Sequence, residues 1–217
     1  MKAINHMTAL AGMALMLACS GCATPQPVAR LHSIDKVGIK TWSHGAEVIT
    51  SPAQDSVQVS VAFRQSMTDY LVFEVTIGND ASEPVFVTPE KFYYELLFTD
   101  TATVVGNRIY ASDPEKALLE MDRRASRLEA AQRNATSFDE SARYDMSFQS
   151  LEEERRHWSE HSIRRNTLRP GYEMAGSVFF PRNNQGRWLR LSIVVENRVF
   201  PFTFQQVLHS PHTMAGE

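Results

Sequence analysis

Hydrophobic and polar residues alternate along several separate stretches of this chain. The alternation is clearest at residues 57–64, 71–78, 189–196 and 200–205, where every second side chain is Val, Ile, Leu or Phe. A period of two places one set of side chains on the buried face of a β-strand. Stretches rich in β-branched and aromatic residues predict further strands, at residues 37–42, 46–50, 84–88, 92–99 and 174–180. The pattern therefore predicts about seven to nine short strands.

A different period governs residues 113–165. From Leu118 onward, apolar or small residues recur every three or four positions, which is the spacing of one helix face. Asp113 suits an N-cap, and Pro114 suits the first helical position. The spacing recurs less regularly from Phe148 to Ser162, and the residues between the two repeats, 134–146, are expected to be a loop or a frayed helix. Ten basic and twelve acidic residues among these 53 predict a solvated insertion rather than core.

Strands are thus predicted on both sides of the helical segment. Neither group of strands alone buries enough apolar surface for a stable core, so the two groups are expected to meet in one core. The predicted fold class is mainly β: an immunoglobulin-like antiparallel β-sandwich over residues 36–208, with a helical insertion at about residues 113–165. Pro170-Gly171 suits the centre of a type II turn. Pro201 cannot donate to a ladder, which predicts that the last strand is an edge strand or carries a bulge.

Two stretches of sequence resemble a known group of domains. One is Leu71 to Asn79 followed by Pro84 to Val87, and the other is Asn166 to Gly171 followed by Gly176 to Pro181. Together they are similar to small secreted Ig-like domains of bacteria, a group that includes many uncharacterised lipoproteins. The shared motif carries no catalytic residue, so the resemblance implies a fold and a compartment but no activity.

The first residues are predicted to be a targeting signal. Residues 1–6 carry one Lys and no acid, and residues 7–18 are apolar apart from Thr8. This run is shorter than the roughly 20 residues that span a bilayer, and it fits a secretory signal peptide. Cys19-Ser20-Gly21-Cys22 then resembles a bacterial lipoprotein signal, which implies that a cysteine is acylated and that the leader before it is removed.

Two cysteines compete for the lipid. Cys22 is favoured because the small residues Ser20 and Gly21 precede it, and the signal peptide is then residues 1–21. Cys19 is the alternative, although the bulky Leu17 stands where a small residue is preferred. A third possibility is an ordinary signal peptide that is cut near Ala23 without lipidation.

The resemblance to lipoproteins also implies an address. Ala23 after Cys22, in place of Asp, implies sorting to the outer membrane, with the domain facing the periplasm rather than the cell surface. Residues 22–35 contain Pro25 and Pro27 and are predicted to be a tether, and residues 209–217 are predicted to be a disordered tail.

Composition and charge exclude several classes of protein. The chain has 217 residues, is 43% hydrophobic and has a formal net charge of −3. This near-neutral balance argues against a nucleic-acid binder, which normally shows a strongly basic field. Cysteine occurs only at positions 19 and 22, which excludes a disulfide scaffold or a cysteine-built zinc site from the body of the chain.

One motif suggests metal chemistry. His157 and His161 lie four residues apart, so on a helix they share a face and could hold one Zn²⁺. His157-x-x-Glu160-His161 is also the inverted zincin pattern, in which the Glu activates a metal-bound water. A zinc-dependent hydrolase is therefore the alternative function. Against it, no clear third ligand stands downstream, and both imidazoles are expected to be solvated beside Trp158, which lies on the apolar stripe.

The leading hypothesis is a non-enzymatic lipoprotein without a cofactor. The N-terminal lipid is expected to bind the protein to the membrane. A protein partner is expected in the cell envelope, and the helical insertion is the expected contact surface. A third interpretation is a ligand-binding sandwich with aromatic residues in a cleft, although core packing accounts equally well for each of the candidates Trp42, Tyr93, Tyr94 and Trp188.

Overall fold

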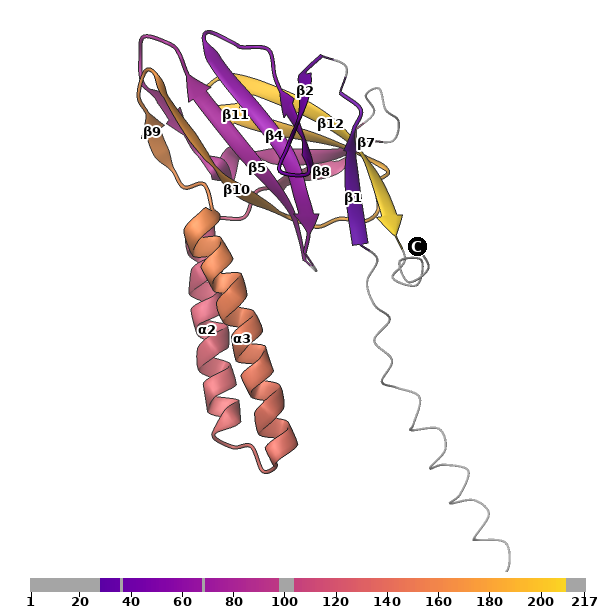
Figure 1. The fold of residues 1–217 in the computed structure, drawn as a ribbon, viewed down its shortest axis with the longest axis vertical. Helices are drawn as coiled ribbons and strands as arrows, with labels where there is room; N and C mark the ends of the chain where they lie inside the picture. Colours follow the sequence, from indigo (N-terminus) through magenta and orange to yellow (C-terminus); the bar gives the residue numbers. More distant parts are fainter. Residues whose placement is uncertain (1–27, 36, 68, 98–103, 210–217) are drawn as a thin grey trace, which may run out of the picture. The chain divides into compact units, whose positions relative to one another are not determined.

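The computed structural model describes residues 28–209, apart from residues 36, 68 and 98–103 (Figure 1). The predicted leader with Cys19 and Cys22, and residues 210–217 of the predicted tail, lie outside the described residues. Residues 29–209 cluster as one unit. The unit contains two antiparallel sheets and two long helices, which confirms the predicted class of a mainly β sandwich with a helical insertion.

The described strands, in chain order, are β1 (Val28–Ser33), β2 (Ile39–Ser43), β3 (Ala46–Thr50), β4 (Val57–Ser66), β5 (Tyr70–Asn79), β6 (Val85–Val87), β7 (Tyr93–Leu97), β8 (Val104–Tyr110), β9 (Asn166–Leu168), β10 (Tyr172–Pro181), β11 (Trp188–Val195) and β12 (Arg198–His209). The helices α2 (Pro114–Gln132) and α3 (Phe138–His161) lie between β8 and β9, and the short 3-10 helix η1 (Pro89–Lys91) precedes β7. One sheet has the order β1-β12-β11-β6-β9, with β7 pairing β11 and β8. The other has the order β10-β5-β4-β3-β2.

The main core lies between the two sheets. Along β5, the alternate residues Leu71, Phe73, Val75 and Ile77 are fully buried, as the period of two predicted. From the opposite sheet, β11 and β12 contribute a second set of buried side chains to the same cluster, namely Leu189, Leu191, Ile193, Phe200, Phe202 and Phe204. Strands from before and after the helices therefore share one core, as expected.

Three strands are absent from the predicted ranges, and one of them is the three-residue β9 just before the predicted Pro170-Gly171 turn. β1 lies inside the segment 22–35 that was expected to be a tether, and β8 lies in a stretch that had no strand assignment. Among the side chains of β1 that the structure describes, Ala29 and Leu31 are buried, and two positions are too few to show a period of two. In β8, Gly106 has a φ of +89° and the pairing with β7 shifts register, which breaks the period of two.

The last strand differs from its prediction as well. β12 has β11 on one side and β1 on the other, and its register with β11 is continuous across Pro201, so it is neither an edge strand nor bulged there. The Ile34 N–H donates to the Thr203 carbonyl at 3.0 Å. Pro201 therefore lies past the end of β1, where its missing N–H breaks no bond to that strand.

The two helices begin at side-chain caps. Asp113 caps α2 as predicted, because its carboxylate accepts the Glu115 N–H at 3.0 Å and Pro114 takes the first helical position. The prediction of a loop or frayed helix over residues 134–146 is confirmed only for residues 134–137, since α3 already begins at Phe138. Ser137 accepts the Glu140 N–H at 3.2 Å, and the Glu140 carboxylate accepts the Thr136 N–H at 3.1 Å. The sequence Ser-x-x-Glu at 137–140 was the overlooked signal.

Both ends of the insertion are tied to β10. The Ser112 N–H donates to the Phe179 carbonyl at 2.8 Å, and the Ile163 N–H donates to the Ser177 carbonyl at 3.0 Å. Ala111 and Ile163 are buried in the main core. In the part of the chain that the structure describes, no helix combines the length and hydropathy needed to cross a membrane.

Asn79 joins the chain before the insertion to the chain after it. Its side-chain nitrogen donates to the Leu168 carbonyl at 3.0 Å and to the Glu83 carbonyl at 2.9 Å, and its side chain is fully buried. Its own carbonyl accepts the Gly171 N–H at 2.7 Å. Gly171 has a φ of +74°, as the predicted Pro-Gly turn requires. The two stretches that carry the resemblance therefore contact each other.

We expect Asn79→Ala to lower the free energy of unfolding by about 2–3 kcal/mol, because two carbonyl oxygens lose their donor inside the protein. Urea denaturation measures the change. Asn107→Ala, at an exposed position on β8, is the control and should change stability by less than about 0.5 kcal/mol. Equal effects of the two substitutions would contradict the role assigned to Asn79.

Candidate functional site at the base of the helical hairpin

The helices α2 and α3 form a hairpin that packs on the outer face of the second sheet. We call this contact the hairpin base, and it is a separate cluster of buried side chains from both helices and from the neighbouring strands β5 and β10, namely Val72, Met121, Leu151, Trp158 and Phe179. The ring centroids of Trp158 and Phe179 lie 3.8 Å apart and the rings are nearly parallel. The hairpin base is thus a second, smaller core.

The strand sequences account for the position of the hairpin base. Val72 and Phe179 lie opposite each other in the β5–β10 register, and both point away from the main core. An outward face that only met water would be expected to carry polar residues at these positions. Trp158 occupies the apolar stripe of α3 as predicted, and it covers this apolar part of the sheet.

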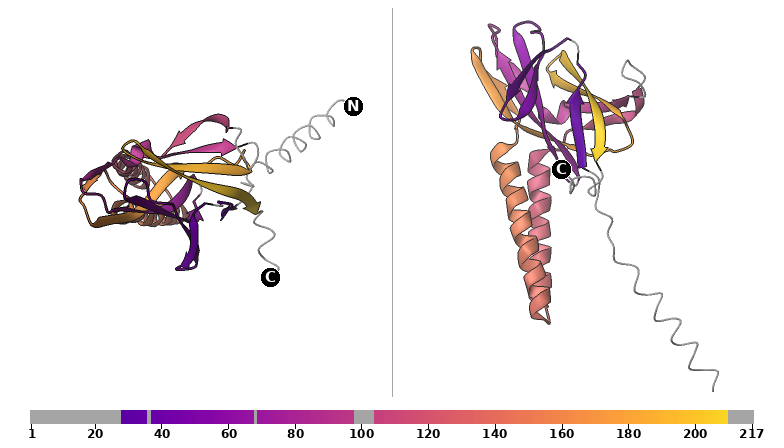
Figure 2. Two further views of the ribbon diagram at one scale, coloured as in Figure 1. Left: turned by 90° about the horizontal axis from the view of Figure 1, so that it is seen from above. Right: turned by 45° about the vertical axis from the view of Figure 1, so that its right-hand side comes forward.

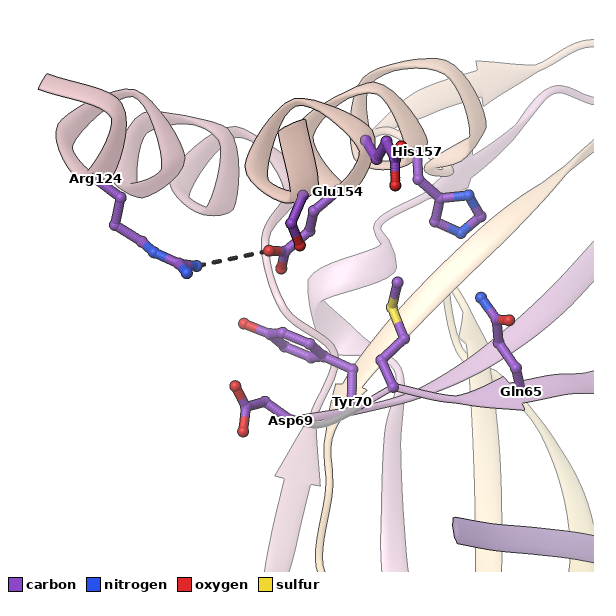
Figure 3. Close-up of a pocket in the computed structure, with 9 residues that line it drawn as sticks. Gln65, Asp69, Tyr70, Arg124, Glu154 and His157 are labelled. Carbon is purple, nitrogen blue, oxygen red and sulfur yellow. Dashed lines mark ion pairs between the residues drawn. The ribbon is translucent and has the colours of Figure 1, made fainter. Parts of the chain in front are cut away.

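A cavity of about 550 Å³ lies beside the hairpin base (Figure 3). Figure 3 shows Arg124, Glu154 and His157 on the helices, across from Tyr70 at the start of β5 and from Asp69 just before it. The Arg124 guanidinium and the Glu154 carboxylate form an ion pair at 3.6 Å. Burial, together with the nearby carboxylates of Glu154 and Asp69, raises the pKa of Tyr70 above its ordinary value.

The charge of this cavity limits what it can accept. Its lining includes the carboxylates of Asp69, Glu153 and Glu154 but only one guanidinium, that of Arg124. Tyr70 supplies an aromatic wall, and its ring lies edge-on to Trp158 with centroids 5.3 Å apart. The lining therefore favours a cationic group over an anionic one.

A second cavity, of about 420 Å³, lies on the other side of His157. It is lined by Glu160 and His161 of α3 and by the ion pair between Arg64 and Glu74 on the sheet. The end of α3 approaches β10 closely here, because a Cβ on Gly176 would lie 2.6 Å from the His161 carbonyl oxygen. Glycine at this position thus allows the helix to reach the strand.

His157 lines both cavities. Its ring lies 5.1 Å from that of His161 and 5.5 Å from that of Phe179, centroid to centroid. Its Nε2 atom is buried without a hydrogen-bond partner. Burial, and to a smaller extent His161, lowers the pKa of His157 below its ordinary value of 6.5. His157 is therefore half-buried and neutral at neutral pH, whereas the sequence predicted two solvated imidazoles. Of the two imidazoles, that of His161 alone is exposed.

The structure brings His157 and His161 together on one face of α3, as their spacing predicted. Among the described residues, no group of three or more His, Cys, Asp or Glu side chains is arranged to hold a metal ion. The zinc-hydrolase alternative thus gains no third ligand within the described part.

The aromatic candidates for a ligand cleft lie apart. Tyr94 is buried in the main core, where its hydroxyl donates to the Pro181 carbonyl at 2.8 Å. Tyr93 is buried on β7 beneath the Arg108 guanidinium, 4.3 Å from the ring centroid. Trp188 lines a cavity of about 460 Å³ beside β8, and Trp42 on β2 is 78% exposed. Of the cavities described above, only the one beside β8 is lined by any of these four side chains, and it holds Trp188 alone.

The fold and the site define a class: a two-sheet β-sandwich that carries a helical hairpin on the outer face of one sheet. Comparison with known proteins and structures identified no relative of this chain. No protein-family model, no curated protein and no solved structure matches the chain.

The lowered pKa of His157 predicts a dependence of stability on pH. The unfolded chain binds a proton at His157 near pH 6.5, whereas the folded chain resists it, so stability falls as the pH drops below about 6.5. We expect His157→Gln to reduce this loss, measured as the free energy of unfolding at about pH 7.5 and pH 5. His32→Gln, at an exposed position on β1, should keep the wild-type dependence. The prediction fails if wild type and His157→Gln lose the same stability between the two pH values.

Proposed function

We propose that this chain is a non-enzymatic accessory protein of the bacterial cell envelope. Lipid on Cys22 anchors it to the outer membrane with the domain facing the periplasm, and the α2–α3 hairpin binds an envelope protein. The anchor is supported by the leader sequence, and the partner surface is supported by the packing of the hairpin. That packing is the observation on which the proposal depends.

Most of the hairpin does not contribute to either core. α2 and α3 contain 19 and 24 residues, but only Pro114 and Met121 of α2 and Leu151 and Trp158 of α3 are fully buried. Farther from the sandwich, the hairpin is held by contacts between its two helices, for example where the Gln132 side chain donates to Asp145 at 2.7 Å. Figures 1 and 2 show the two helices side by side along their length.

The outer part of the hairpin presents isolated apolar side chains among charges. Phe138 is 86% exposed and Met146 is 64% exposed. The surrounding ion pairs, such as Arg133 with Glu129 at 3.6 Å, are exposed and contribute about 0–1 kcal/mol each. A protruding surface of exposed apolar and mixed charged residues suits a protein partner better than nucleic acid.

The hairpin prediction is tested by shortening the two helices without disturbing the hairpin base. Asp122 lies opposite Arg155 and Gln132 lies opposite Asp145, so residues 129–148 can be replaced by a short turn that joins Leu128 to Gln149. The shortened chain keeps Met121, Leu151 and Trp158. We expect its stability to remain within about 1 kcal/mol of wild type, because no residue of either buried cluster is removed.

Binding is measured by photocrosslinking in living cells. A photoreactive amino acid at Phe138 should give a discrete adduct with an envelope protein, since this side chain is almost fully exposed. The same probe at Tyr172, which is 64% exposed on β10, is the matched control and should not give that adduct. The same partner captured at both positions, or no adduct at Phe138, would remove the hairpin from the proposal. Loss of the partner from the shortened chain, in pull-down with an affinity tag, would support it.

The lipid anchor has a separate test. In cells fed a clickable palmitate analogue, we expect wild type and Cys19→Ser to be labelled and to fractionate with membranes, whereas Cys22→Ser is not labelled. The opposite result for the two substitutions would move the lipid to Cys19. Absence of label from the wild-type chain would contradict the proposed lipid anchor.

A further inference from the structure

β2 is an exposed strand at the end of its sheet. Within the described residues it pairs only with β3, and all five of its side chains are exposed. Large apolar side chains are concentrated at this edge, because Val37, Ile39 and Trp42 are 74%, 68% and 78% exposed. An unpaired edge with apolar side chains is a ready template for another strand.

The turn after β2 determines which backbone groups are free. His44 and Gly45 have φ values of +49° and +75°, as in a type I′ turn of two residues. Such a turn makes Ser43 and Ala46 a hydrogen-bonded pair, so Ser43, Thr41 and Ile39 direct their backbone groups toward β3. The N–H and C=O groups of Lys40 and Trp42 therefore point away from the sheet.

The pairing of β3 with β4 supports this assignment. The Ser51 N–H donates to the Val59 carbonyl at 2.8 Å. Ser51 thus faces β4, and alternation along the strand turns Thr50 and Val48 toward β2, where they lie opposite Ile39 and Thr41.

The edge lacks the usual protection against another strand. Natural edge strands are often guarded by a Lys, a Pro or a bulge. Residues 39–43 contain no Pro, and the β2–β3 register runs without a shift. The Lys40 ammonium is turned toward its own chain, where it donates to the Ser33 carbonyl at 3.0 Å and lies 3.5 Å from the Glu47 carboxylate. The ammonium therefore does not block the free edge, although the Lys40 side chain remains 35% exposed.

We infer that β2 pairs with β2 of a second copy of this chain, antiparallel and with the two-fold axis at Thr41. In this register Lys40 lies opposite the partner's Trp42, and the outward groups of both residues meet. About four backbone hydrogen bonds then form across the edge. Each Lys40 stem also lies beside an indole, which is a favourable pairing for a cation.

The neighbouring registers are worse, and this favours a second copy over an arbitrary strand. A shift of two residues in one direction places Lys40 directly opposite the partner's Lys40, and like charges in opposed positions are destabilising. A shift in the other direction places Lys40 opposite the partner's His44, which already belongs to the turn. Of these three registers, only the one centred on Thr41 avoids both the Lys40–Lys40 pair and the pairing with the turn.

The predicted register can be trapped with disulfides in the purified full-length chain. Two residues that face each other across a non-hydrogen-bonded antiparallel pair have Cα atoms about 4.5 Å apart, within disulfide range. Thr41→Cys should therefore form a disulfide-linked dimer, mapped to position 41 by mass spectrometry. Ile39→Cys is equally exposed, but the two copies of this residue would lie about 13 Å apart, too far to bridge.

The same register predicts a second cross-link, between two different positions. Residue 39 lies opposite residue 43 of the other copy, so a mixture of Ile39→Cys and Ser43→Cys chains should cross-link while each alone does not. The five-residue contact is small compared with a stable interface of about 1,600 Å². The dimer fraction should therefore rise with protein concentration. Wild type, which keeps Cys19 and Cys22, gives the background.

We expect Thr41→Cys to cross-link at least about tenfold faster than Ile39→Cys. Trp42→Pro added to Thr41→Cys should abolish the cross-link, because it removes an outward N–H that the β2–β3 pairing does not use. Trp42→Thr added to Thr41→Cys keeps this N–H, so part of the cross-linking should remain. Equal rates for Thr41→Cys and Ile39→Cys would overturn the inference. So would the absence of a position-41 disulfide at the highest concentration, or a cross-link in cells from position 41 to a different protein alone.

Discussion

The hydrogen bonds of Asn79 are the constraint on which the rest of the structure depends. The chain leaves the sandwich after β8, builds two helices and must return in register to complete the same core. Asn79 fixes that return, because its side chain holds the Leu168 carbonyl and its own carbonyl holds the Gly171 N–H. The following strand, β10, then runs antiparallel to β5 along its whole length. A buried amide with three partners is specific in a way that apolar contacts are not.

The strand β10 carries two cores on its two faces. Val178 and Phe180 face the main core, whereas Phe179 between them stacks on Trp158 at the hairpin base. A shift of β10 by one residue would exchange these faces and disrupt both clusters at once. The register that Asn79 sets therefore also determines where the hairpin packs, and with it the position of His157 between its two cavities.

The sequence allowed a good part of this arrangement to be predicted, and the failures have physical causes. The alternation in β4, β5 and β11 and the cap at Asp113 are local signals, and both are confirmed. β1 and β8 were missed because few of their side chains are buried or because a glycine breaks the period. The shared face of His157 and His161 followed from helix geometry. The burial of His157 did not follow from the sequence. It depends on contact with Phe179, which is distant along the chain, and the sequence does not show that α3 is the element that covers Phe179.

The way the insertion is attached determines how easily it can be replaced. Its two ends are hydrogen-bonded to Phe179 and Ser177 of one strand, so the gap that it bridges is narrow. A module with neighbouring ends can be exchanged, lengthened by whole helical turns or lost while the host scaffold keeps its strand order. The core of the sandwich needs no change for such an exchange, because both ends of the insertion stay attached to β10.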